Sequence, residues 1–342
     1  MKNQAGVAVV ITTVLRPSLV RAVRSVFRQD LGQPIQILIG IDKRLNDDGC
    51  LSVLTQECPP HINITIIDLG YSTSSKSGGL YSNNCGGALR TILSYAANGK
   101  YIAYLDDDDW WSRDHLSGLL SAIAGKEWAF SYRWLVDHET AWPICRDEWD
   151  ALGPGRGINL ERFGGFVNPS NLMIDKQACH FVLPYWSFSA FEDGTGDDRV
   201  VFDILLKNYA WAASRKYSCY YDVPRDVQKH DHHAREFAAR NITWIEDRAQ
   251  IDTIVELLDE AKRALDAGST EEAILACRRA IALNRYHAPS LHCLALSERQ
   301  AGNREKYLAC NAEASEMADG FPAEFPLPEL THPAMPDKER PR

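Results

Sequence analysis

The chain has 342 residues, of which 45% are hydrophobic and 24% are charged, and its formal net charge is −9 at pH 7. A chain of this length can hold two domains, and its composition is ordinary for a globular protein. The negative charge argues against general nucleic-acid binding, which depends on neutralising phosphates, and no stretch approaches the roughly 20 apolar residues that span a bilayer.

The first half of the chain alternates between predicted strands and predicted helices. A run of β-branched residues at 6–14 predicts a buried strand, and apolar residues at helical spacing after Pro17 predict a helix that reaches Phe27. Strands that alternate with helices pair in parallel, so we expect an α/β sheet. The other expected elements are strands at 35–41, 62–69, 101–105, 167–174 and 217–223, a helix at 84–97 that is closed by Asn98-Gly99, and a helix at 200–206.

From about residue 251 the sequence is alanine-rich and helical, and residues 34 positions apart match. This period is the signature of tetratricopeptide repeats, although an ordinary helical hairpin would also fit. After Gly320 the chain is rich in proline and charge, which is typical of a disordered tail. We therefore expect a domain at 1–240, a small all-α tetratricopeptide-like module at 250–318 and a disordered tail at 320–342. The matching pairs are Leu257 and Leu291, Ala261 and Ala295, Gly268 and Gly302, Glu271 and Glu305, and Ala280 and Ala314.

Four consecutive aspartates, Asp106 to Asp109, follow directly on the predicted strand 101–105. Four like charges at the end of a buried strand repel one another, and a cation among them would relieve this repulsion. Carboxylate oxygens are hard ligands that suit Mg²⁺ or Mn²⁺, and Mg²⁺ is commonly shared with substrate phosphates. The cluster therefore indicates a metal-bound diphosphate at the carboxyl end of a strand. An acidic turn that caps the next helix is the alternative.

Five segments of the first 230 or so residues stand in an informative order. They are Val7–Thr13 with Arg16-Pro17, the helix end Val23–Gln29, the strand Ile37–Asp42, the run Asn98–Trp111 and the tripeptide Gly196-Asp197-Asp198. In this order they resemble the family-2 glycosyltransferases. The resemblance implies a GT-A fold, which is a Rossmann-like domain that binds a nucleoside-diphosphate sugar. Two departures, Lys43–Asp47 after Asp42 and the Asn83-Asn84 pair, concern the regions where the family recognises the base and sugar of the donor.

The run of aspartates resembles the D-x-D signature of the family, which implies a metal site. We expect Asp108 to be the first metal ligand with Asp106 beside it, while Asp106 and Asp107 contact the ribose or a metal-bound water. Asp109 is expected to cap the next helix. The resemblance also implies a histidine after the last strand, and His230 is the candidate ligand, in competition with His232 and His233.

Asp198 resembles the last residue of the family's Gly-Glu-Asp motif, which implies that it is the catalytic base. A carboxylate opposite the leaving diphosphate can accept the proton of the acceptor hydroxyl, and Asp197 would orient the loop or the acceptor. An acidic pair at a helix start is the alternative, and Glu192-Asp193 lies close enough to compete. The candidates for contacts to the donor are Thr12, Thr13, Arg16, Asp42 and Lys76, with Asp42 at the nucleobase and the two basic residues at the phosphates.

The sequence therefore predicts a metal-dependent inverting glycosyltransferase, of hexosyltransferase type, that uses Mn²⁺ or Mg²⁺ and a nucleoside-diphosphate sugar, with a UDP-sugar expected. The acceptor is a glycan, a lipid-linked or a protein hydroxyl, as in the assembly of bacterial surface polysaccharide, and the aromatic stretch 128–149 would lie on the acceptor side or in the core. The alternative is a protein-interaction adaptor that uses the helical repeats and carries an inactive transferase domain. A nucleotidylyltransferase is disfavoured, because the first loop, 12–17, is neither glycine-rich nor basic enough.

The nine cysteines are scattered without a C-x-x-C pair, which predicts reduced thiols in a cytoplasmic protein. We expect no signal peptide, no transmembrane segment and no nucleic-acid partner. Peripheral association with the inner face of the membrane, a protein partner and self-association through the helical repeats all stay open.

Overall fold

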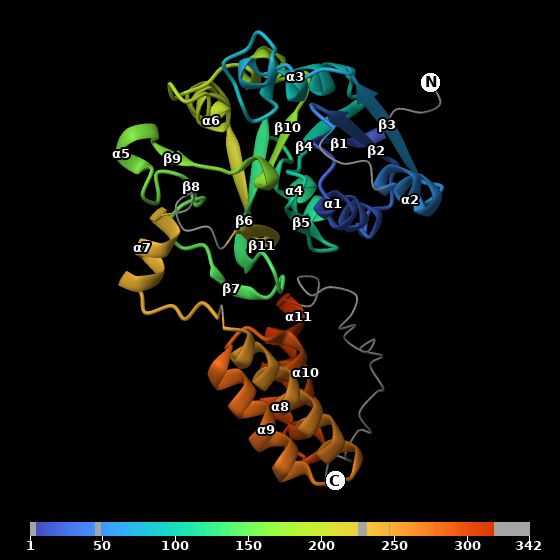
Figure 1. The fold of residues 1–342 in the computed structure, drawn as a ribbon, viewed down its shortest axis with the longest axis vertical. Coiled ribbons are helices and arrows are strands. Elements are labelled where there is room, and N and C mark those ends of the chain that lie inside the picture. Colours follow the sequence, from blue (N-terminus) through green and yellow to red (C-terminus); the bar gives the residue numbers. More distant parts are fainter. Residues whose placement is uncertain (1–4, 45–48, 225–230, 246, 318–342) are drawn as a thin grey trace, which may run out of the picture. The chain divides into compact units, whose positions relative to one another are not determined.

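The computed structural model describes residues 5–44, 49–224, 231–245 and 247–317. The chain forms two compact units, Met1–Ile245 and Glu246–Arg342. Figure 1 shows that the first unit is built around a sheet with helices beside it, whereas the described part of the second, residues 247–317, is built of helices. No helix in the described ranges has the length and apolar content that crossing a bilayer requires.

A nine-stranded mixed sheet forms the centre of the first unit, in the order β3-β2-β1-β4-β10-β6-β11-β5, and β7 pairs with β6. As the alternation of elements predicts, β1 pairs in parallel with β2 and β4, and β2 with β3. Farther along, β10 runs antiparallel to β4 and β6, while β8 and β9 form a separate short ribbon. The strands are β1 (Ala5–Thr13), β2 (Ile35–Ile41), β3 (Ile62–Asp68), β4 (Gly99–Tyr104), β5 (Trp110–Trp111), β6 (Trp128–Asp137), β7 (Pro143–Arg146), β8 (Gly153–Pro154), β9 (Gly165–Phe166), β10 (Leu172–Asp175) and β11 (Trp211–Val223).

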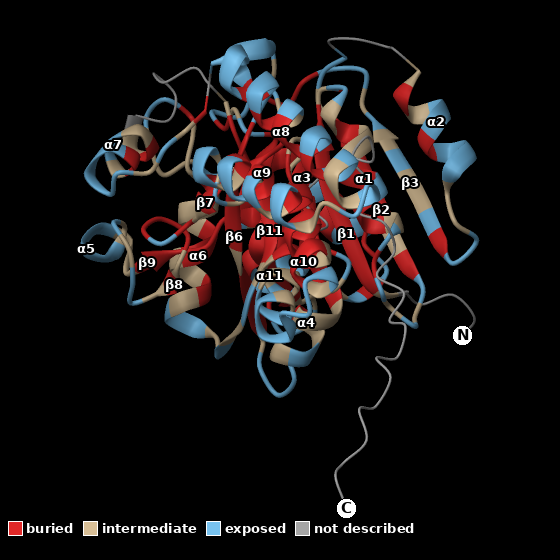
Figure 2. Cartoon of the chain, turned by 90° about the horizontal axis from the view of Figure 1, so that it is seen from below, coloured by how far each residue is buried: buried red, intermediate tan, exposed pale blue. Residues whose placement is uncertain are grey.

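The central strands carry apolar residues on both faces of the sheet, and helices therefore cover both faces. Val7, Val9 and Ile11 of β1 pack in one core cluster with α1, α2 and α4, whereas Ala8 and Val10 pack in a second with α3, η3 and α6. Figure 2 shows these central strands as buried, while β3 at the edge of the sheet is a mixture of exposed and intermediate residues after its buried first residue. The helices are α1 (Ser18–Phe27), α2 (Cys50–Glu57), α3 (Gly87–Ala96), α4 (His115–Ala122), α5 (Leu160–Phe163), α6 (Asp197–Asn208) and α7 (Asp231–Ala239), with 3₁₀ turns η1 (Ser75–Ser77), η2 (Pro169–Asn171) and η3 (His180–Ser187).

Two predicted elements differ from the structure for local reasons. The strand expected at 167–174 is interrupted by η2, because Pro169 has no backbone N–H and the side chain of Asn168 accepts a hydrogen bond from the backbone N–H of Ser170. The helix expected from residue 84 begins at Gly87, because the Asn83 side chain accepts hydrogen bonds from two backbone N–H groups and so shapes a turn. Both turns form part of the wall of the cleft described below as the candidate active site.

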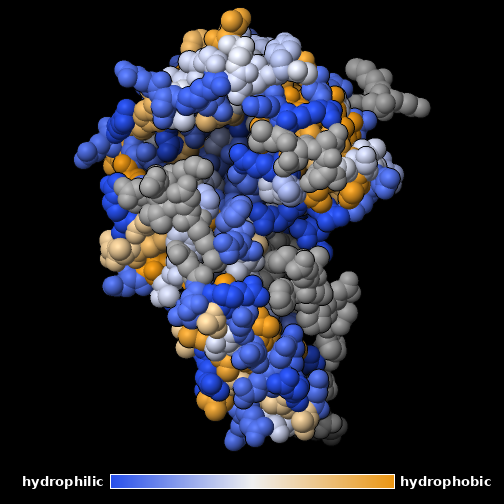
Figure 3. Space-filling view, in the orientation of Figure 1, coloured by the Kyte–Doolittle hydropathy of each residue, from blue (hydrophilic) through white to orange (hydrophobic). Residues whose placement is uncertain are grey.

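Where the second unit is described, its helices form two hairpins: α8 (Arg248–Asp266) with α9 (Thr270–Leu283), and α10 (Ala288–Gln300) with α11 (Arg304–Met317). Gly268 and Gly302, which are 34 positions apart, both adopt a left-handed conformation in the turn of their hairpin. The tetratricopeptide-like character of the unit stays a prediction, and the tail predicted at 320–342 lies outside the described residues. On the face in view, Figure 3 shows a largely hydrophilic surface with apolar side chains in small groups. The core contains Leu258, Ala261, Ala276, Cys277, Cys293 and Leu294.

Candidate active site

A cleft of about 680 Å³ opens at the carboxyl ends of the parallel strands in the first unit. The residues that follow β1, β2 and β4 meet there because these strands run in the same direction. The cleft is lined by Thr12, Asp42 and Asp106 from these ends and by Asp198 from the start of α6. The fold thus gathers side chains that lie almost 190 positions apart in the sequence.

The acidic tip of β4, residues Asp106 to Asp108, lines the cleft with three consecutive carboxylates. The Thr13 hydroxyl donates to Asp107 at 2.7 Å, and Arg16 Nη1 donates to Asp107 at 3.2 Å and to Asp108 at 2.6 Å. Burial and the adjacent Asp108 charge still raise the pKa of Asp107 to about 6, and burial raises that of Asp106. Clustered carboxylates whose ionised form is disfavoured, and whose oxygens are hard ligands, fit a divalent cation.

Asp109 does not cap the next helix, so that expectation is wrong. Its buried carboxylate accepts a hydrogen bond from the backbone N–H of Asp222 at 3.0 Å, because β5 turns back at once and pairs with β11. Arg21 lies over the Trp110 ring at 3.7 Å and donates to the carbonyl oxygen of Asp108 and to the Asp222 carboxylate. These contacts hold the backbone of the acidic tip in place.

Arg90 is a residue of this site that the sequence analysis missed. It lies on α3 with 4% of its surface exposed, and it donates to Asp106 at 2.6 Å and to Asp197 at 2.9 Å. One guanidinium thereby joins the end of β4 to the start of α6, and it also lies over Trp186 at 4.8 Å. Because the arginine stands among the apolar positions of a predicted helix, the sequence gives no sign of its two distant partners.

Replacing Arg90 with methionine is expected to lower the free energy of unfolding by about 3–5 kcal/mol, because the buried Asp197 and the partly exposed Asp106 lose their shared cation. Burial already raises the pKa of Asp197 to about 7, so the folded protein takes up a proton there on acidification. The loss should therefore be smaller at about pH 5 than at about pH 7.5. Denaturant titrations at both pH values measure this loss of unfolding free energy. Arg90→Lys is the control that retains the charge. A loss that is the same at both would contradict the assigned role.

Asp198 lies in the first turn of α6 and lines the cleft with 22% of its side chain exposed. Gly196 precedes the helix at φ +82°, and a Cβ there would meet the Phe191 ring at 2.7 Å, so only glycine fits this turn. The competing Asp193 instead accepts hydrogen bonds from the backbone and hydroxyl of Thr195, outside the cleft lining. The turn thus brings Asp198 rather than Asp193 into the cleft that holds the acidic tip.

The predicted contacts to the donor are divided between the cleft and its surroundings. Asp42 lines the cleft, but its carboxylate already accepts hydrogen bonds from Ser72 and Thr73 at 2.9 to 3.2 Å. Lys76 lies exposed on η1, outside the cleft lining. Thr12, Thr13 and Arg16 line the cleft, so the five assignments stay predictions with only Lys76 placed elsewhere.

The three candidate histidines have different positions. His230 lies outside the described residues, His232 lines the cleft, and His233 is buried where it accepts a hydrogen bond from Trp149 Nε1 at 3.2 Å. The tryptophans of the stretch 128–149, like Trp110 and Trp111, are buried in the core. Core packing therefore accounts for them, and the aromatic rings that line the cleft are Phe166, Phe191 and Tyr221.

Comparison with known protein families identifies a segment of the first unit. Residues 8–136 match the family described as Glycosyl transferase family 2, a segment that runs from β1 through the acidic tip into β6. Residues 8–136 of the first unit are a family-2 glycosyltransferase segment. The GT-A fold expected from the sequence is confirmed, and the chain is a glycosyltransferase. The matched segment of the domain ends before Asp198 and His232.

Two solved structures illustrate what the chain is similar to. TarS of S. aureus (residues 1–349) in complex with UDP-GlcNAc is 12% identical, with a TM-score of 0.47 over 91% of this chain and 90% of that one. The mannosyltransferase PcManGT from Pyrobaculum calidifontis, in complex with GDP-Man and Mn²⁺, is 14% identical, with a TM-score of 0.45 over 93% of this chain and 86% of that one. Among curated proteins, no sequence matches the chain.

Proposed function

We propose that the transferase domain moves a sugar from a nucleoside-diphosphate sugar to a hydroxyl group, with inversion at the anomeric carbon and with a divalent cation bound. The observation that carries this proposal is the meeting in one cleft of two separate carboxylate groups, the acidic tip of β4 and Asp198 of α6. A displacement of this kind needs a charge-stabilising site for the leaving diphosphate and a base for the attacking hydroxyl.

On the donor side, the acidic tip supports a cation site in which Asp108 and Asp106 hold Mn²⁺ or Mg²⁺. When bound, the cation supplies Lewis-acid stabilisation of the departing diphosphate. Arg16 is half-exposed and can exchange its contacts with Asp107 and Asp108 for the phosphate oxygens of the donor. Arg90 donates a hydrogen bond to Asp106 at 2.6 Å and holds it in place.

On the acceptor side, Asp198 accepts the proton of the acceptor hydroxyl while that oxygen attacks the anomeric carbon and the bond to the diphosphate breaks. The Asp198 carboxylate accepts a hydrogen bond from the backbone N–H of Arg199 at 2.7 Å, which orients it. The acceptor is a hydroxyl of a glycan, a lipid-linked or a protein acceptor, and the donor is a UDP-sugar, as the resemblance implies.

A thermal-shift panel of UDP, GDP and their sugars, each with and without Mn²⁺, tests the proposal. Ligand at about 100 times its Kd stabilises by about 2.7 kcal/mol, which raises Tm by several degrees for a domain of this size. We expect such a shift for one nucleotide series, dependent on Mn²⁺ and abolished by a chelator, followed by release of the same diphosphate from its sugar. A panel without any Mn²⁺-dependent shift would contradict the donor assignment.

The binding of Mn²⁺ and UDP together is expected to weaken on acidification. The pKa of Asp107 is raised to about 6 and that of Asp106 is raised as well, so protons compete for these carboxylates below the raised values. Calorimetry at about pH 7.5 should therefore give a lower Kd than calorimetry at about pH 5, where normal carboxyl groups remain largely ionised. A Kd that does not change between the two would contradict the involvement of these groups.

A further inference from the structure

Asp150 is a buried carboxylate in the cleft wall to which the transfer reaction as described gives no role. It follows β7 and exposes 4% of its surface. Its Oδ2 accepts a hydrogen bond from Arg133 Nη2 at 2.6 Å, and its Oδ1 accepts one from Asn159 Nδ2 at 2.6 Å. Arg133, on β6, is 1% exposed and donates through Nε to Asp147 at 2.7 Å. A single buried guanidinium thus anchors two carboxylates.

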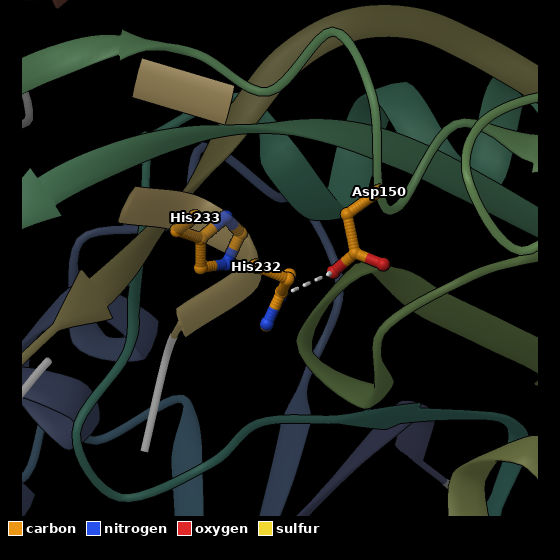
Figure 4. Close-up of side chains that lie close together, drawn as sticks. All are labelled: Asp150, His232 and His233. Atoms are coloured by element: carbon orange, nitrogen blue, oxygen red, sulfur yellow. Dashed lines mark ion pairs between the residues drawn. The ribbon is translucent and has the colours of Figure 1, made fainter. Parts of the chain in front are cut away.

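Asp150 also faces two cleft residues that lie on helices α6 and α7. Its Oδ1 lies 3.8 Å from Nη2 of Arg199 on α6, and its Oδ2 lies 3.8 Å from Nε2 of His232 on α7. Figure 4 shows the side chain of His232 directed at this carboxylate. Asp150 therefore connects β6, α6 and α7 at the wall that carries Asp198.

Asp150, His232 and His233 offer possible ligand atoms within 4.8 Å of one another. Their hydrogen bonds and ion pairs, however, do not fit a metal site. Trp149 Nε1 donates to His233 Nδ1, so the proton of the neutral ring is on Nε2 and neither nitrogen has a lone pair left for a cation. Two guanidinium groups, those of Arg133 and Arg199, also face Asp150. The cluster is an ion-pair network rather than a cation site.

Arg199 lies between two carboxylates. Its Nη2 is 3.8 Å from Asp150 and its Nη1 is 3.9 Å from Asp198, and it stacks on the Phe166 ring at 3.0 Å. Nη1 is buried and makes no hydrogen bond in the described part of the chain. If Asp150 lost its charge, the guanidinium would be attracted to Asp198 alone. A close ion pair favours the ionised form of a carboxylate and makes it a poorer proton acceptor.

We propose that Asp150 is a positioning residue of the transfer reaction, which holds Arg199 away from Asp198 and so leaves the base free to accept a proton. This inference rests on the proposed function, in which Asp198 is the base. Asp147 provides a matched control, because it is equally buried and bonds the same arginine. Within the described residues, its other hydrogen bonds come from the backbone N–H groups of residues 149–151 and not from α6 or α7.

The test compares the full-length variants D150N and D147N. Turnover is followed as release of nucleoside diphosphate from UDP-glucose, UDP-N-acetylglucosamine and GDP-mannose, each with Mn²⁺ and with water as acceptor. In D150N we expect kcat to fall by about tenfold or more, the order expected when a base loses basicity, with an unchanged KM for the donor. D147N should lose thermal stability but retain kcat. The added substitution R199Q should restore kcat in D150N, because the competing guanidinium is gone.

Crystal structures of the two variants give a readout that depends on no donor. In D150N we expect the Arg199 guanidinium within about 3.2 Å of an Asp198 oxygen, which is hydrogen-bond distance, whereas D147N should keep the parent separation. An Arg199 that stays in place in D150N, or a kcat loss that R199Q does not relieve, would overturn the inference. Failure of the proposed function is distinguishable, because D198N would then retain the parent turnover whatever D150N does.

Discussion

Replacing Asp198 with asparagine is expected to lower kcat for sugar transfer by about 10²–10⁴-fold, the usual contribution of a general base. Asparagine keeps the shape of the side chain and can still accept the hydrogen bond from the backbone N–H of Arg199, but it cannot take a proton. Binding of the nucleotide with Mn²⁺ should stay close to that of the parent, because the acidic tip is unchanged. Turnover and calorimetry on the same preparation measure the two effects.

Asp203→Asn is the control for this variant. Asp203 lies on the same helix, α6, and pairs with Lys207 on its surface at 2.7 Å, so its replacement removes the same charge outside the cleft. It should leave kcat unchanged. If Asp198→Asn transfers sugar as fast as Asp203→Asn, Asp198 is not the base, and another group in the cleft must accept the proton.

Replacing Asp108 with asparagine is expected to weaken Mn²⁺-dependent binding of UDP by at least about 100-fold, since even residues behind a metal ligand cost 10–100-fold. The side chain of Asp108 is 38% exposed, and it forms an ion pair with the half-exposed Arg16. Its loss should therefore change the free energy of unfolding little, so that the binding defect is a local one. Calorimetric titration of UDP with and without Mn²⁺ checks both the size and the metal dependence of the effect.

The matched control for Asp108 is Asp114→Asn. Asp114 is a half-exposed aspartate that pairs with Lys216 outside the cleft. A general effect of net charge would appear in both variants, whereas the loss of a metal ligand would appear in Asp108→Asn alone. Equal Kd values for UDP in the two variants would remove Asp108 from the metal site.

Local sequence patterns were sufficient for most of the parallel part of the sheet. The strand at 35–41 was predicted to the residue, because β-branched residues are concentrated there and both faces are buried. Side-chain turns displaced the predicted boundaries elsewhere. Asn83 and Asn168 replace helix or strand hydrogen bonds with side-chain ones, which propensity does not reveal.

The candidate site could be predicted only where its residues lie together in the sequence. The four aspartates and the pair Asp197-Asp198 are visible as runs, so their chemistry can be inferred. Arg90 could not be assigned a role because its partner Asp197 is 107 positions away. Asp150 acquires its partners only when β6, α6 and α7 pack together, and no local spacing records that contact.

The central claim is that the acidic tip of β4 binds a cation that in turn binds a diphosphate. Crystals soaked with Mn²⁺ and UDP test it most directly, because manganese can be located by its anomalous scattering. The account predicts a peak within coordination distance, about 2.0–2.3 Å, of Asp108 or Asp106, shared with oxygens of both phosphates. A manganese peak away from these carboxylates, or UDP bound in the cleft without any metal, would contradict it.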